Sequence, residues 1–161
     1  MVDWDEQIKA HIFWVWKERE GFFKRGKEGM LVITDRRLAF ISKTDMTYKM
    51  HETHSLRQLK RFESSENVFR PAEGYKLEHL ERDLDKSPDN LELPFSQIID
   101  ITSEEKDWGT LLKVNENLGD KAKIHKFSVV KGWVKYPAKD PIGFQKMDWT
   151  PLINLVKTSA T

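Results

Sequence analysis

The chain contains no cysteine and no apolar run that approaches the length of a membrane span. Without cysteine there is no disulfide framework, no thiolate metal ligand and no thiol nucleophile, which suits a reducing compartment. A helix that crosses a bilayer needs roughly 20 apolar residues. The first six residues have neither the basic region nor the apolar run of a signal peptide. We therefore expect a cytoplasmic protein without a transmembrane segment.

The chain also lacks an excess of charge of either sign. It has 27 Lys plus Arg against 26 Asp plus Glu, so no global field draws it to nucleic acid, and we do not expect nucleic acid as a partner. Its 161 residues are 39% hydrophobic and include six Trp and nine Phe. That is enough to bury one core, and we predict a single domain over residues 1–161.

Motifs that would indicate catalysis are missing as well. There is no Gly-x-Ser-x-Gly elbow, and the glycines at 21, 26 and 29 fit neither phosphate-binding fingerprint. His51 and His54 are three residues apart, whereas a zincin helix needs a spacing of four. We predict that the protein is not an enzyme, and we predict no metal site and no cofactor.

What the sequence does contain is a set of strand-like runs. Met30–Ile33 and Leu38–Ile41 flank Thr34–Arg37, and Asp35 suits a tight turn, so the sequence predicts a hairpin. Gly109–Val114 and Ile124–Val130 predict a second hairpin.

The two ends of the chain favour helices. We expect a short opening helix that includes Ile8, followed by a strand over residues 12–16. Near the other end, Thr150 and Pro151 are typical of a helix start, and the apolar residues after them predict a C-terminal helix with Trp149 against the core.

Two segments resemble a known family. Residues 29–40, Gly-Met-Leu-Val-Ile-Thr-Asp-Arg-Arg-Leu-Ala-Phe, resemble the GRAM and bacterial PH-like pattern, with Asp35 where Asn is more usual. Residues 93–101, Leu-Pro-Phe-Ser-Gln-Ile-Ile-Asp-Ile, resemble the next strand of that family. The resemblance implies a mainly β (α+β) fold, a PH-like antiparallel β-barrel or sandwich closed by a C-terminal helix.

Between these segments, residues 45–90 have helical spacing and predict a two-helix insertion. One predicted apolar face holds Leu56, Leu59 and Phe62, and the other holds Leu77, Leu80 and Leu84. We expect these faces to be buried on the domain itself or at a contact with another subunit or partner. Leu77, Leu80 and Leu84 are the candidate partner-binding residues.

The sequence leaves two functions open. Protein interaction or self-association through the insertion is the leading hypothesis. The alternative is peripheral binding of phosphoinositide or another anionic lipid, because the resemblance implies a headgroup site at the first basic loop. The candidate lipid-binding residues there are Lys17, Arg19, Lys24, Arg25 and Lys27. Glutamates at 18, 20 and 28 are interspersed among them and weaken the attraction to phosphate.

Overall fold

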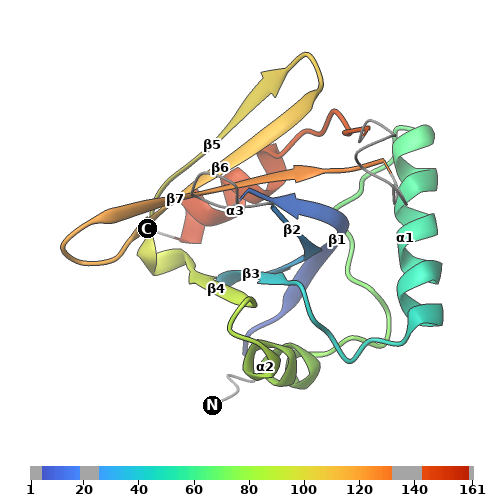
Figure 1. The fold of residues 1–161 in the computed structure, drawn as a ribbon, viewed down its shortest axis with the longest axis horizontal. Coiled ribbons are helices and arrows are strands. Elements are labelled where there is room, and N and C mark those ends of the chain that lie inside the picture. The colour runs from blue at the N-terminus through green and yellow to red at the C-terminus, as the bar shows by residue number, and fades with distance from the viewer. Residues whose placement is uncertain (1–4, 19–25, 132–142, 160–161) are drawn as a thin grey trace.

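The structure is a computed structural model that describes residues 5–18, 26–131 and 143–159. In this part of the chain seven strands form one antiparallel sheet in the order β4-β3-β2-β1-β7-β6-β5, and three helices accompany it (Figure 1). The strands are β1 Ile8–Lys17, β2 Lys27–Thr34, β3 Arg37–Ile41, β4 Leu91–Pro94, β5 Ile98–Lys106, β6 Gly109–Asn117 and β7 Ala122–Val129. The helices are α1 Tyr48–Glu63, α2 Leu77–Lys86 and α3 Thr150–Ser159. The expected mainly β fold with a C-terminal helix is confirmed.

Both predicted hairpins are present, as β2–β3 and β6–β7. The prediction of an opening helix that includes Ile8 is wrong, because Ile8 belongs to β1 and pairs with Thr34. Residues 93–101 are not one strand: β4 ends at Pro94, a 3-10 turn spans Phe95–Gln97, and β5 begins at Ile98. The N–H of Phe95 still donates to the Arg36 carbonyl at 2.9 Å, which extends the β3–β4 register by one residue into the turn.

Strands β2 and β3 are buried on both faces, which explains why their sequences are continuously apolar rather than alternating. Leu31, Ile33 and Phe40 point into the main core, which includes Trp149, Leu152 and Val156 around α3. Met30, Val32 and Ile41 point the other way, into a second cluster with Leu80 of α2. As predicted, Trp149 is fully buried at the entry to α3.

The two helices of residues 45–90 lie between β3 and β4, but their buried faces differ. On α2, Leu80 is fully buried, and Leu77 and Leu84 pack partly buried against the second cluster. On α1, Leu59 and Phe62 are half-buried, whereas Leu56 is 47% exposed, so Leu56 is not buried on its own domain, and its burial at a contact with another subunit or partner stays a prediction. The residues of α1 that are buried are polar: His54, Ser55 and Gln58.

The polar face of α1 is explained by an irregularity in β1. The pairing of β1 with β2 shifts register between Ile12 and Val15, and Trp14 has a positive φ of 56°. The Gln58 side chain bonds Phe13 inside this irregularity, accepting from its N–H at 2.7 Å and donating to its carbonyl at 2.9 Å. One buried amide thus takes the place of a neighbouring strand, because buried backbone groups require partners.

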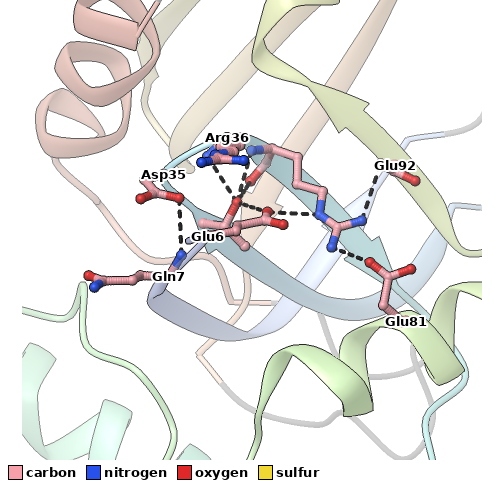
Figure 2. A network of polar contacts seen from close by, with 8 residues as sticks. Glu6, Gln7, Asp35, Arg36, Glu81 and Glu92 are labelled. Carbon is pink, nitrogen blue, oxygen red and sulfur yellow. Dashed lines mark hydrogen bonds and ion pairs between the residues drawn. The ribbon is translucent and has the colours of Figure 1, made fainter. Parts of the chain in front are cut away.

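A buried arginine joins four parts of the chain around the β2–β3 turn (Figure 2). Arg37 of β3 donates to Glu6 at 2.9 Å, to Glu92 of β4 at 3.3 Å, and to Glu81 of α2. Thr34 Oγ1 accepts the N–H groups of Arg36 and Arg37 and donates to Glu6. Burial opposes the charge of Arg37, but its hydrogen bonds to Glu81 and Glu6 outweigh burial and raise its pKa. The network holds α2 and the N-terminal segment on the sheet.

We predict that Gln58→Met lowers the free energy of unfolding by about 3 kcal/mol, because the N–H and C=O of Phe13 each lose a buried partner. Chemical denaturation measures the loss, and hydrogen exchange at the Phe13 amide locates it. Thr53→Met, on an exposed position of the same helix, is the control and should change stability by less than about 0.5 kcal/mol. Equal stability of the two variants would show that Gln58 does not complete the sheet.

Candidate functional site

Three arginines surround a hollow between α1 and the segment that returns from it to the sheet. Arg57 and Arg61 are four residues apart on α1 and so share a helix face. Arg70 lies on the returning segment, whose backbone bonds β1 through His11 N–H and the Arg70 carbonyl at 2.9 Å. The hollow measures about 250 Å³. Its other lining residues are Phe13, His54, Pro71, Ala72 and Glu73.

The charges in this arginine hollow are only partly compensated, since one acid, Glu73, lines it beside three arginines. Within residues 5–18, 26–131 and 143–159, none of the three arginines forms an ion pair. Burial lowers the pKa of Arg61, and the charges of Arg70 and Arg57 lower it further, while Glu66 acts in the opposite direction. Arg57 and Arg70 are exposed and Arg61 is half-buried, so an anion from solvent has access to all three guanidinium groups. Guanidinium groups bind phosphate and carboxylate in forked geometry.

The wall of the hollow is a layer of rings. The Phe13 ring is nearly parallel to the His11 ring, at a centroid distance of 6.1 Å, and to the His54 ring, at 6.0 Å. His54 Nε2 is 3.1 Å from the Glu73 carbonyl, which fixes the ring against the returning segment. The side of the hollow beside the arginines is therefore formed by packed rings whose positions are fixed in the free protein.

His11 is the most deeply buried member of this layer, with 2% of its surface exposed. Its Nδ1 accepts the N–H of Ala72 at 2.9 Å, which places the proton of the neutral ring on Nε2. Nε2 is buried and has no hydrogen-bond partner among the described residues. Burial, and then the charge of His54, lower the pKa of His11 to about 3.

The structure describes only part of the predicted basic loop. Arg19, Lys24 and Arg25 lie outside the described residues. Lys17 and Lys27 line a second hollow, of about 350 Å³, together with Lys123 and His125. We call it the loop-base hollow.

Acids compensate the positive charges of the loop-base hollow. Glu18 and Asp89 also line it. Lys27 forms an ion pair with Asp89 at 3.1 Å, and burial lowers the pKa of His125, whose Nε2 is 2.9 Å from Glu116, so this ring adds little positive charge. Its described part is therefore less electropositive than the arginine hollow.

The leucines of α2 and the buried carboxylate of Asp83 contribute to the packing and hydrogen bonding of the fold. Leu77, Leu80 and Leu84 contact the sheet of their own chain, and their role in partner binding stays a prediction. Asp83 is buried, and its carboxylate accepts bonds from Tyr75 Oη, Thr44 Oγ1 and the Asp45 N–H. Burial, followed by the bond to Asp83, raises the pKa of Tyr75. These bonds fasten α2 to the segments on either side of α1.

Metal ligation has no support in the described residues, since no three His, Asp or Glu side chains there are placed to share an ion. None of the helices in those residues is long and apolar enough to cross a membrane. A scan against models of known protein families and a search of curated proteins find no match for this chain.

Sequence reasoning did not identify the arginine hollow. The spacing of Arg57 and Arg61 was a usable signal, because positions i and i+4 of a helix lie side by side. Arg70 was not predictable, since its place depends on how residues 64–76 return along β1. The predicted basic residues were instead those that the family resemblance implies.

We predict that stability falls on acidification. His11 binds a proton near pH 6.5 in the unfolded chain but only near pH 3 in the folded protein. Its neutral ring therefore contributes fully above about pH 6.5, and the contribution is lost as the pH falls from 6.5 toward 3, by up to about 1.4 kcal/mol per pH unit. His51, whose pKa burial also lowers, adds to the slope.

The measurement is the free energy of unfolding between pH 7.5 and 4.5, in wild type and in His11→Asn. Asparagine keeps an acceptor for the Ala72 N–H, so the variant should fold. Its free energy of unfolding should depend less steeply on pH than that of wild type, by up to about 1.4 kcal/mol per pH unit. Thr53→Asn, at an exposed position of α1, alters no titratable group and is the control, which should keep the wild-type slope. A slope that His11→Asn leaves unchanged contradicts the assignment.

Proposed function

We propose that the protein is a non-enzymatic binding module with a PH-like fold of the GRAM type, and that the arginine hollow holds an anionic group of its ligand. The fold proposal is supported by the antiparallel sheet with a C-terminal helix and by the resemblance of residues 29–40 and 93–101. The observation that carries the functional proposal is a built hollow with three arginines and no ion pair to them among the described residues.

A structural role for these arginines accounts poorly for their arrangement. Arginines that stabilise a fold pair with carboxylates, as Arg37 does with Glu6, Glu81 and Glu92. The positive charges of Arg57, Arg61 and Arg70 instead repel one another. Like charges at positions i and i+4 of a helix lower its stability by about 0.2–0.5 kcal/mol. A bound anion would relieve this repulsion and form charge-assisted hydrogen bonds.

A phosphate group fits the hollow better than a single carboxylate. A phosphomonoester carries between one and two negative charges near neutral pH and offers three acceptor oxygens. Three guanidinium groups match that number of acceptors. About 250 Å³ is ample for a phosphate group and too little for a large ligand, which indicates that the hollow recognises one group of a bigger molecule.

We predict that inorganic phosphate raises the melting temperature of the wild-type protein at low ionic strength and that Arg57→Gln/Arg61→Gln loses this effect. Ligand that binds only the folded state stabilises it, by about 2.7 kcal/mol at 100 times its dissociation constant. Scanning calorimetry over a phosphate series, with chloride as the reference anion, measures the shift. The shift should shrink as salt is added, because the contacts are ionic.

The matched control is Lys49→Gln/Lys60→Gln, which removes the same charge from the same helix at exposed positions that do not line the hollow. It should respond to phosphate as wild type does. Without phosphate, Arg57→Gln/Arg61→Gln should be at least as stable as wild type, because repulsion is removed. A stabilisation that both double variants lose equally would indicate a diffuse charge effect and no site.

The loop-base hollow supports a second candidate, peripheral binding of anionic lipid. Lys17 and Lys27, two of the five residues that the sequence suggested, line it together with Lys123. In addition, the charges of Lys17 and Lys123 are close enough to lower the pKa of His125, after the effect of burial. Lys17 ends β1 and Lys27 begins β2, so both adjoin the first loop, where the family resemblance implies a headgroup site.

For this candidate we predict that Lys24→Ala/Arg25→Ala/Lys27→Ala abolishes sedimentation with phosphoinositide vesicles. Each cation near an anionic membrane surface contributes about 1 kcal/mol. Stability should change little, because a partly exposed ion pair such as that of Lys27 with Asp89 contributes little. Wild-type protein that stays in the supernatant at low salt would eliminate the lipid candidate and leave the arginine hollow untouched.

A further inference from the structure

A third hollow adjoins the arginine hollow and shares Arg61 with it. It measures about 440 Å³ and reaches from the end of α1 to the start of α3. Its lining is mixed, with polar and apolar side chains in nearly equal share. Its apolar lining residues are Phe62, Val68, Phe69, Met147 and Pro151. We call it the apolar hollow.

The two hollows follow one seam, because neighbouring residues divide between them. On α1, Arg61 lines both hollows and Phe62 lines the apolar one. On the returning segment, Phe69 lines the apolar hollow and Arg70 the arginine hollow. A ligand that extends along the seam therefore meets guanidinium groups first and aromatic rings next.

We infer that the seam binds an extended peptide segment of a partner protein, with a phosphorylated side chain in the arginine hollow and an apolar side chain in the apolar hollow. The inference rests on the proposed function, since the arginines provide the anchor. An extended chain advances by about 3.3 Å per residue, and the two hollows share Arg61, so the two side chains should lie within a few residues of each other in the peptide. Charge complementarity at one end and apolar burial at the other would fix the direction of the peptide.

The charges around the apolar hollow favour a peptide over other carriers of phosphate. Glu66 and Asp148 both line it, beside Lys146. An anionic membrane surface or a nucleic-acid backbone would place further negative charges close to these carboxylates, and the repulsion would oppose binding. A peptide with one phosphorylated residue avoids this conflict, and its residues near Glu66 and Asp148 should be neutral or basic.

The rigidity of the seam is also suited to a peptide. The ring of Phe69 packs against Trp149 of the core at a centroid distance of 6.1 Å. The Phe69 N–H donates to Asn67 Oδ1 at 3.0 Å, and the Arg70 N–H to the Val68 carbonyl at 3.0 Å. Because these contacts are already made in the free protein, little ordering is needed on binding.

The test uses a peptide pool with a fixed phosphoserine and three randomised residues on each side, followed by sequencing of the retained peptides. We expect at least tenfold tighter binding than inorganic phosphate shows. Leu, Ile, Met or Phe should be enriched at one position within three residues of the phosphoserine, and Asp and Glu should be depleted beside it. The same pool without the phosphate should not be retained.

A filling substitution separates the two hollows. Pro151→Trp places a large ring at an exposed position of the apolar hollow, in the first turn of α3, where proline is not required. It should weaken binding of the peptide pool about tenfold and leave the response to inorganic phosphate unchanged. Asn154→Trp introduces the same ring at an exposed position of α3 that does not line the hollow, and should bind the pool as wild type does.

The outcomes distinguish the peptide inference from the proposed function, which is an anion site at the arginine hollow. If phosphate stabilises the protein through Arg57 and Arg61 but the pool shows no apolar preference, the peptide inference is overturned and the anion site stands. If phosphoinositide vesicles bind through the same arginines while the pool does not, the ligand is a lipid headgroup and the inference is again overturned. If neither phosphate nor the pool binds, the proposed function itself fails.

Discussion

The rest of the structure depends on one constraint, that the β2–β3 hairpin is apolar on both faces. Leu31 and Phe40 face one way, and Val32 and Ile41 the other, so a single covering layer would leave half of these side chains in water. Helix α3 covers the first face and the α2 region the second. The helices between β3 and β4 are therefore part of the core and not an appendage, which is why buried polar groups such as Arg37 and Asp83 are used to fasten them.

The face of the sheet that α2 covers also includes β1, whose pairing with β2 shifts register between Ile12 and Val15. Beyond its contact with β7 at residues 15–17, β1 has no neighbouring strand on that side among the described residues, and other groups bond its backbone there. Gln58 bonds both polar groups of Phe13, and His11 bonds the returning segment through its backbone and its ring. This need explains the polar buried face of α1. It also brings Arg57, Arg61 and Arg70 together, because the helix and the segment that complete β1 are the elements that carry them.

The predictable parts of the fold were those whose signals are local. The β2–β3 turn follows from Thr34 and Asp35, the helix start from Thr150 and Pro151, and the burial of Leu80 from its helical spacing. Where the structure departs from the predictions, a distant contact decides. Leu56 shares a face with Leu59 and Phe62 by helical spacing, but the backbone of β1 is bonded by the amide of Gln58, so Gln58 faces the sheet and Leu56 is exposed in the single chain. Ile8 was assigned to a helix, but pairing with Thr34 extends β1 to include it. The arginine hollow was missed for the same reason, since two of its arginines share a helix face in the sequence but the third arrives only through the return to β1.

The way charges are distributed separates the parts that hold the fold from the part that is open to a ligand. Arg37 is buried among three carboxylates, and Lys113 and Lys106 both pair with Glu104. Each of these cations has an acid within the chain, so none needs an external anion. Around the seam the balance is different: guanidinium groups gather at one end, and Glu66 and Asp148 stand at the other. Because the arginines are accessible and repel one another, their removal should not weaken the fold. A cluster that costs stability and rests on a rigid wall is better explained by recognition of an anion than by folding.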